Sequence, residues 1–112
     1  MLNFAKYEGR IRRNMLESLY LYVTQGVPVG DFLQAVLENN LVEAYGRADE
    51  ENTLAMRDYA DLLYNEMPSP SWGSKEKVDA WIECFQRARA WAMVAEAAAE
   101  QRKGGKGNER AS

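Results

Sequence analysis

YNEMPSPSWGSKEKVDAWI (residues 64–82) contains the strongest structural break in the sequence. Its PSPS run (68–71) ends any preceding helix, because proline has no amide hydrogen to donate. Ser74 then offers a favourable side chain for capping the free amides of a new helix. The segment therefore predicts two parts: a group of helices before it and one long helix after it.

The long helix is predicted to run from Lys75 to about Lys103. The GGKG run (104–107) is expected to stop it, which leaves residues 104–112 as a disordered basic tail. Apolar residues at helical spacing form its first stripe, and they are Val78, Trp81, Ile82 and Phe85.

Four shorter helices are predicted before the break, within residues 9–24, 30–38, 41–48 and 49–66, with the second starting near Gly30 or Asp31. The last two are either separate helices or one bent helix. Asn40 and Asp49 are expected to cap the last two. The inward face of the third helix is predicted to consist of Leu41, Ala44, Tyr45 and Ala48. The other inward residues are predicted to be Ile11, Met15, Leu16, Leu19, Tyr22, Val23, Phe32, Leu33, Val36, Leu37, Ala55, Tyr59, Leu62 and Leu63. We therefore expect an all-α bundle of about five helices, with a long C-terminal helix, forming a single domain over residues 1–103.

The composition excludes several classes of enzyme and of binding site. The 112 residues include no histidine and one cysteine, which rules out Ser-His-Asp and Cys-His catalysis and a disulfide within the chain. No Walker or GxGxxG loop is present, and no apolar run is long enough to cross a membrane. The acidic run DEE (49–51) is better explained by helix capping than by metal binding. We therefore expect no catalysis, no cofactor, no metal and no membrane contact.

Positive charge is concentrated at the two ends of the chain. Four basic residues against Glu8 give residues 1–13 a net charge of +3, and residues 101–112 also carry +3. The remaining body carries −9. An acidic body disfavours duplex DNA, because the neutralisation of phosphates supplies most non-specific affinity. The basic ends are either contact points for a nucleic acid or an acidic partner, or simply solvated.

The junction around Trp72 is the leading candidate for a contact site. Its indole ring can stack on a base, and the Gly73-Ser74 helix start presents free amides that attract phosphate. Lys75 and Lys77 follow and add positive charge. The more ordinary interpretation is that Trp72 anchors the loop to the core and Ser74 is a simple helix cap.

Arg10 and Arg13 form the second candidate site. They are three residues apart and therefore share one face of the predicted first helix. Their guanidinium groups can clamp a phosphate or pair with the acidic residues of a partner. The ordinary interpretation is that both side chains are solvated.

The alanine-rich half of the long helix, RARAWAMVAEAAAE (87–100), needs a protein surface to cover it. Trp91 and Met93 point in nearly opposite directions, so apolar surface lies on more than one side. Either the helix crosses the whole bundle or it packs against a second copy of the chain. We expect a homo-oligomer whose interface includes Trp91, Val94 and Ala95.

Two blocks, GVPVGDFLQAVLENNLVEAYGRADEEN (26–52) and LLYNEMPSPSWGSKEKVDAWI (62–82), resemble a family of short proteins found in bacteriophages and prophages. Together they cover a little under half of the chain. The resemblance implies a small helical accessory protein with no established activity and no catalytic residues. Residues 83–112 and the RIRR stretch (10–13) lie outside the resemblance, so functions special to this chain are expected at its two ends.

These features predict a non-catalytic phage accessory protein that acts in the host cytoplasm by binding and disabling a host component. The component is expected to be a defence protein or a nucleotide signal, such as a cyclic nucleotide. The alternative is a nucleic-acid-associated phage factor that acts through the basic termini. An enzyme is the weakest of the three, because no catalytic constellation is present.

Overall fold

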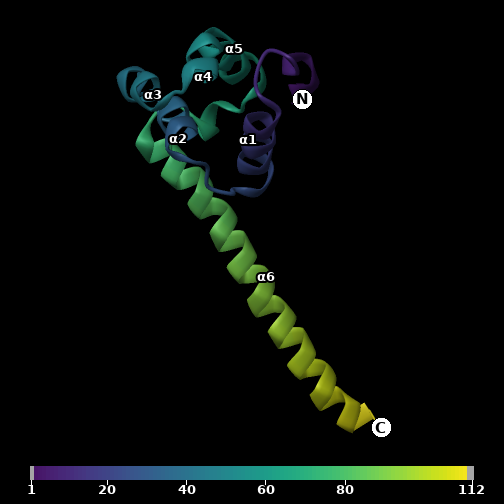
Figure 1. The fold of residues 1–112 in the computed structure, drawn as a ribbon. Coiled ribbons are helices and arrows are strands. Elements are labelled where there is room, and N and C mark those ends of the chain that lie inside the picture. The colour runs from purple at the N-terminus through teal and green to yellow at the C-terminus, as the bar shows by residue number, and fades with distance from the viewer. Residues whose placement is uncertain (1, 111–112) are drawn as a thin grey trace.

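The computed structural model describes the backbone of residues 2–110 and the side chains of residues 2–100. The molecule consists of a head and a projecting helix, with dimensions of 68 × 27 × 22 Å. Figure 1 shows five helices gathered in the head and a sixth, α6 (Lys75–Arg110), leading away from it. In the described residues the regular elements are all helical. The predicted all-α fold with a long C-terminal helix is confirmed.

The N-terminal segment differs in detail from its prediction. It begins with the 3-10 turn η1 (Phe4–Tyr7), and the first α-helix, α1 (Arg13–Gln25), starts four residues later than the predicted Gly9. The reason is local, because Gly9 has a φ of +85°, which lies outside the helical region. The chain turns there, so that Glu8 and Ile11 pair in an isolated bridge.

Four short helices complete the head, and they are α2 (Asp31–Leu37), α3 (Leu41–Arg47), α4 (Glu50–Leu54) and α5 (Met56–Glu66). Both predicted caps are confirmed. The side chain of Asn40 accepts a hydrogen bond from the backbone amide of Glu43 at 3.3 Å. The side chain of Asp49 accepts one from the backbone amide of Asn52 at 2.8 Å.

The helix predicted within residues 49–66 is divided at Ala55 into α4 and α5. The break accompanies a buried polar contact, in which the Tyr59 hydroxyl donates a hydrogen bond to Asn52 Oδ1 at 2.7 Å. An unbroken helix would hold these two residues roughly 10 Å apart along its axis. A buried amide group requires a hydrogen-bond partner, and the break in the helix gives Asn52 that partner. The spacing of apolar residues does not indicate this hydrogen bond.

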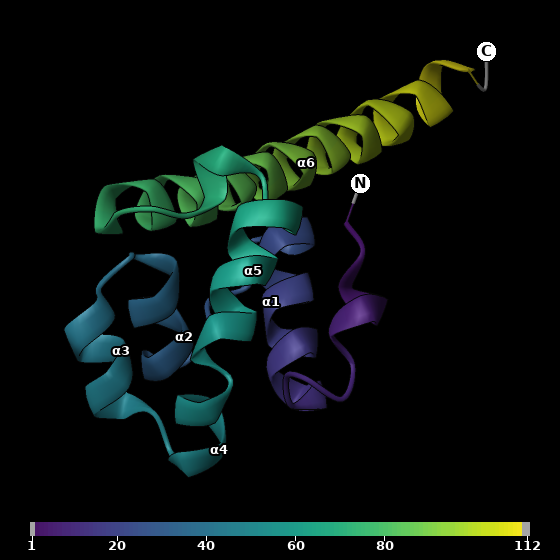
Figure 2. The ribbon, with the colours of Figure 1, turned by 90° about the horizontal axis from the view of Figure 1, so that it is seen from above.

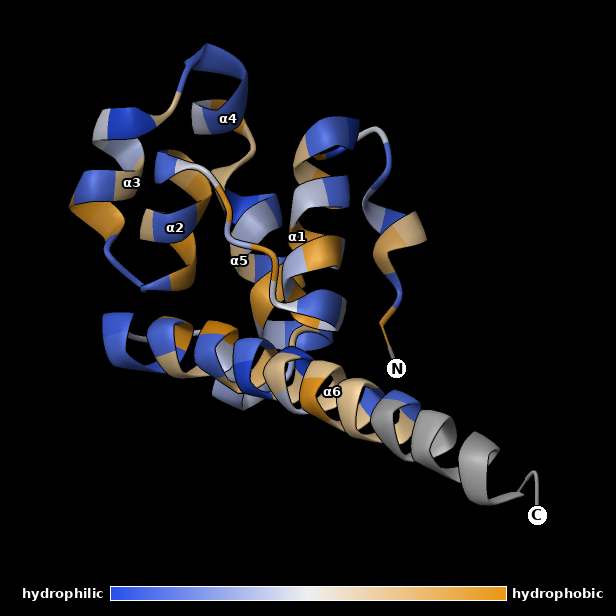
Figure 3. Ribbon diagram, turned by 90° about the horizontal axis from the view of Figure 1, so that it is seen from below, coloured by the Kyte–Doolittle hydropathy of each residue, from blue (hydrophilic) through white to orange (hydrophobic). Residues whose placement is uncertain are grey.

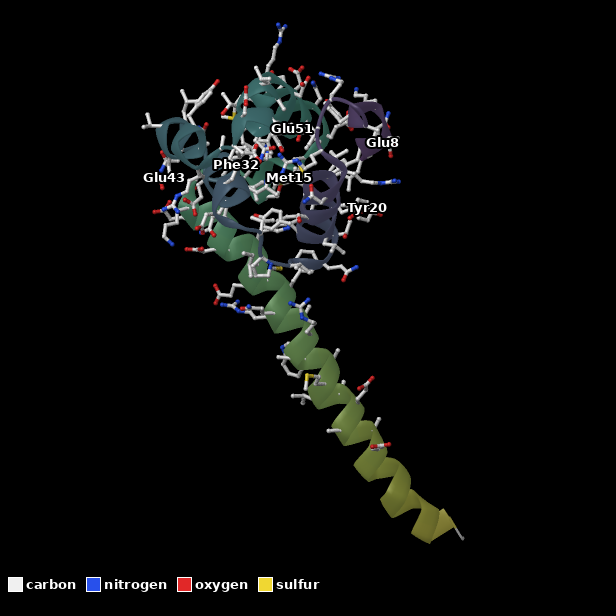
Figure 4. The ribbon with its side chains drawn as sticks, viewed as in Figure 1. Glu8, Met15, Tyr20, Phe32, Glu43 and Glu51 are labelled. Atoms are coloured by element: carbon white, nitrogen blue, oxygen red, sulfur yellow. The ribbon has the colours of Figure 1, made fainter. Side chains whose placement is uncertain are left out.

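The core lies where the inner faces of α1, α2 and α5 meet the beginning of α6. Figure 4 shows Phe32 and Met15 within the head, while Tyr20 and Glu43 lie at its margins. Figure 3 shows the apolar segments of these helices turned toward one another. The predicted inward residues of α1, α2 and α5 are buried apart from Met15, which is partly buried. The largest fully buried side chains include Tyr7, Leu19, Tyr22, Leu37, Tyr59, Leu62 and Val78.

α3 departs from the predicted pattern of burial. Ala44 is buried, but Leu41 is 63% exposed and Tyr45 is 47% exposed. The prediction that Leu41 and Tyr45 face the core is therefore wrong. The physical reason is that α3, with seven residues, packs mainly against α2, and no described part of the chain covers its outer side.

The beginning of α6 crosses the C-terminal end of α1, as Figure 2 shows. α1 ends at Gly26, which caps the helix with a φ of +68°. The ring of Phe85 lies so close that a Cβ atom on Gly26 would come within 2.5 Å of Phe85 Cβ. Farther along α6, Arg89 Nη1 donates a hydrogen bond of 2.9 Å to the carbonyl of Gln25. This carbonyl is at the negative end of the α1 dipole, where a cation is favourable.

Beyond Arg89, α6 leaves the head, and we call its residues 90–100 the arm. α6 continues to Arg110, past the GGKG run where the sequence predicts its end near Lys103. Interior glycines weaken a helix by about 1 kcal/mol each but do not prevent its hydrogen bonding. The side chains of residues 101–112 lie outside the described part of the chain, and the disordered tail at 104–112 stays a prediction.

Replacing Gly26 with alanine is expected to lower the free energy of unfolding by about 2–4 kcal/mol, because the new methyl group meets Phe85 and the backbone is left-handed there. Gly46→Ala is the matched control. Nothing lies within 4 Å of a Cβ atom at Gly46, so that change should alter stability by less than about 1 kcal/mol. Urea unfolding followed by circular dichroism measures both, and equal effects would contradict the close packing of α6 on α1.

Candidate functional site

The loop before α6 is held by buried hydrogen bonds. It contains the 3-10 turn η2 (Ser69–Ser71), and Ser71 is completely buried. The Tyr22 hydroxyl donates a hydrogen bond of 2.7 Å to the Ser71 carbonyl. The amide of Gly73 donates another of 2.7 Å to the carbonyl of Leu37, at the end of α2. The loop that carries the candidate contact residues is therefore fixed to both α1 and α2.

The polar side chains at the start of α6 are already engaged within the chain. Ser74 Oγ accepts a hydrogen bond from the amide of Lys77 at 3.1 Å, so the predicted cap is confirmed. The Lys75 ammonium lies 3.0 Å from a carboxylate oxygen of Asp79. The Lys77 ammonium donates to the carbonyl of Ser69 at 3.3 Å. A phosphate at this helix start would have to displace these partners.

Trp72 is partly buried and packs against the hydrophobic core. Its indole Nε1 is buried and has no hydrogen-bond partner within the described residues. Because an unpaired buried donor is costly, the ring is held here by apolar packing. The position agrees with the ordinary interpretation of Trp72 as an anchor for the loop.

The arginine candidates lie elsewhere. Arg10 is 2.7 Å from Asp58 and 3.2 Å from Asp61, and its guanidinium lies 4.8 Å from the centre of the Tyr7 ring. Arg13 is exposed, and its Nε lies 3.9 Å from Oε2 of Glu17, a looser contact than those of Arg10. These residues are near the start of α1, whereas the loop before α6 contacts Tyr22 near its end. The structure does not bring Arg10 and Arg13 together with Trp72.

Sequence reasoning missed the partners of the basic N-terminal segment. Arg12 lies 2.6 Å from Asp49 and 3.1 Å from Glu51, and Lys6 lies 3.1 Å from Glu66. The opposite charges of the two segments were visible in the sequence. Their separations exceed 36 residues, so no helical spacing indicated which cation would meet which carboxylate.

These ion pairs lower the pKa values of two carboxyl groups that take part in them. The hydrogen bond from Arg12 lowers the pKa of Asp49, and a further bond from the Asn52 amide acts in the same direction. Lys6 lowers the pKa of Glu66 in the same way, assisted by the Asn3 amide. Both carboxylates therefore favour the folded state in their charged forms.

A groove of about 310 Å³ lies between α3 and α5, and we call it the α3–α5 groove. Its polar edge includes Asn39, Asn40 and Arg57. The apolar side chains that line it include Val36, Leu41, Tyr45, Met56, Ala60 and Leu63. The groove therefore provides an open apolar floor with a cation at its edge.

The arm is the second unassigned surface. Trp91, Met93 and Val94 are 72%, 69% and 57% exposed, and Ala95 is also exposed. Figure 4 shows the side chains of this part of α6 directed outward on several sides, away from the head. The helix does not cross the bundle, so the first of the two predicted arrangements is not found. Within the described residues, no other part of the chain covers the arm.

Other classes of site find little support in the described residues. Among them no group of His, Cys, Asp and Glu is arranged to hold a metal ion. No helix in that part of the chain has the length and apolarity needed to span a bilayer. Cys84 is a single exposed thiol.

No protein-family model, curated protein or solved structure matches this chain.

Acidification is expected to destabilise the head through the pKa values of Asp49 and Glu66. Folding lowers the pKa of both groups. Their contribution to the free energy of unfolding is therefore complete above the unfolded pKa, near 4, and is lost as the pH falls through the folded pKa. The double variant Asp49→Asn/Glu66→Gln should show a flatter fall in the free energy of unfolding below about pH 5. Identical slopes for the double variant and the wild type would refute the ion-pair account.

The packing of Trp72 predicts different effects for two substitutions. Trp72→Phe keeps an aromatic ring and removes the unpaired N–H, so the free energy of unfolding should change by less than about 1 kcal/mol. Trp72→Ala leaves a cavity and should cost about 2–4 kcal/mol. Chemical unfolding measures both changes, and equal losses in the Phe and Ala variants would contradict the packing account.

Proposed function

We propose that this protein is a non-catalytic accessory protein of the phage and prophage type that its sequence resembles. It acts in the host cytoplasm as a homo-oligomer, by binding a host protein and blocking its action. The observation that carries the proposal is the arm, on which Trp91, Met93 and Val94 are exposed. Apolar side chains gathered on a projecting helix are typical of a surface that another protein covers.

A protein target is better supported than a nucleotide signal. A site for a cyclic nucleotide would need free cations beside a free ring and free amides. Lys75 and Lys77 are bonded within the chain, and Trp72 is packed on the core. Lys75 and Lys77 nevertheless have exposed side chains, so this junction stays the proposed contact surface for a host protein, with Trp72 holding it in place.

The nucleic-acid alternative is less well supported. Arg10 and Arg12 at the basic N-terminus are paired with carboxylates, and Arg13 is the most exposed of the three. Binding to phosphate would require the first two to give up these partners. An enzymatic role receives no support from the sequence, which lacks histidine and the known phosphate-binding loops.

Light scattering is expected to give a mass above 12.7 kDa for the intact chain at tens of micromolar. Trp91→Asp/Val94→Asp should lower that mass, because it places charge in the proposed apolar interface, while circular dichroism stays helical. Gln86→Asp, an exposed change on the same helix, is the control and should leave the mass unchanged. A wild-type protein that stays monomeric would contradict self-association.

Cross-linking the tagged protein in host cells, followed by mass spectrometry, is expected to identify one host protein. Lys75→Glu should weaken its capture, whereas Trp72→Phe, which keeps the loop packed, should not. Calorimetry with a panel of cyclic nucleotides should show no binding. Binding of a cyclic nucleotide that Lys75→Glu abolishes would replace the protein target with a nucleotide signal.

A further inference from the structure

Within the described residues, the α3–α5 groove and the arm are both apolar surfaces that the chain leaves uncovered. We propose that the arm of one copy docks in the α3–α5 groove of a second copy, with Met93 on the apolar floor and Glu96 and Glu100 beside Arg57. The inference rests on the proposed self-association and specifies which surface receives the arm.

The α3–α5 groove resembles one side of a protein–protein interface, because apolar side chains are exposed along it. Leu41 and Tyr45 follow the spacing of an inward helix face, yet they remain 63% and 47% exposed at the edge of the groove. Leu54, on neighbouring α4, is 80% exposed. An apolar groove of about 310 Å³ receives the side chains of a docked helix in the manner common to helix-in-groove recognition.

The arm presents one face that matches this groove. Met93, Glu96, Ala97 and Glu100 follow the spacing i, i+3, i+4 and i+7, so they share one side of α6. Methionine is unbranched and adapts to irregular apolar surfaces. Trp91 points toward the opposite side of the helix and Val94 lies about 100° round the helix from Met93, which leaves both for contact between two arms.

Charge favours the α3–α5 groove over a second groove on the head. Within the described residues, the carboxylates of Glu96 and Glu100 take part in no ion pair, and the same holds for the guanidinium of Arg57. A second groove lies between η1 and α1, and its charged lining residues are Glu8, Arg13 and Glu17, which together carry a net charge of −1. The charged residue that lines the α3–α5 groove is Arg57, so an acidic arm is better complemented there.

A chain cannot place its own arm in its own groove. The last hydrogen bond between α6 and the head is that of Arg89. Glu96 lies seven residues farther along a straight helix, roughly 10 Å beyond that point. Figures 1 and 2 show α6 continuing away from α3 and α5 in both views, so the occupant must come from another copy.

A charge-exchange experiment tests the pairing. Arg57→Glu and Glu96→Arg/Glu100→Arg are made as separate proteins, and their association is measured by sedimentation velocity. Each variant alone should self-associate about tenfold more weakly than the wild type, because like charges then meet at every arm and groove. An equimolar mixture should recover the wild-type affinity, since the reversed arm meets the reversed groove and the unaltered arm meets the unaltered groove.

Two leucine substitutions provide a matched control. Leu41→Asp, at the α3–α5 groove, should weaken association, and Leu21→Asp, at the η1–α1 groove, should not. Both leucines are exposed, so both variants are expected to keep the helical circular dichroism of the wild type. If Arg57→Glu and Leu41→Asp associate like the wild type, while Trp91→Asp/Val94→Asp does not, the groove inference is wrong and self-association stands. A monomeric wild type would refute self-association itself.

Discussion

Tyr22 connects the two parts of the chain that the proline-rich break separates. Its hydroxyl donates to the Ser71 carbonyl, and its own carbonyl accepts a hydrogen bond of 3.1 Å from Trp81 Nε1. Burial raises the pKa of Tyr22, so the hydroxyl stays protonated and remains a donor. Together with the hydrogen bond from the Gly73 amide to the Leu37 carbonyl, Tyr22 fixes the loop before α6 and with it the positions of Trp72 and Ser74.

The N-terminal segment is attached to the head by a different kind of interaction. Lys6, Arg10 and Arg12 all meet carboxylates of α4, α5 or their caps, while Tyr7 and Ile11 are buried beneath them. Partly exposed ion pairs each contribute little, so the apolar contacts provide most of the attachment. The basic end of the chain therefore serves folding first, and its charge is largely neutralised before any partner arrives.

Features governed by neighbouring residues were predictable from the sequence. The caps at Asn40, Asp49 and Ser74 depend on hydrogen bonds that span three residues. The apolar faces of α1, α2 and α5 are visible as helical spacing in the sequence.

Features that depend on the path of the chain in space were not predictable in this way. The meeting of Arg12 with Asp49, 37 residues away, has no local signal. The burial of α3 was predicted wrongly because its spacing indicates an apolar face but not whether the same chain covers it. In the candidate site, Ser74, Lys75 and Lys77 bond to partners at most eight residues away. The packing of Trp72 on the core and the hydrogen bond from the Gly73 amide to the Leu37 carbonyl have no local signal.

The docking of α6 on the head also affects how the arm forms. Starting a helix is its unfavourable step, because several residues must be ordered before the first hydrogen bond is gained. The segment from Val78 to Phe85 is ordered by packing on α1, so the arm extends a helix whose nucleus already exists. Alanine, the best helix former, then makes each added residue favourable without a partner. The head therefore preorganises the arm, although the arm itself does not contact the head. A partner that binds the arm binds a helix that has already formed.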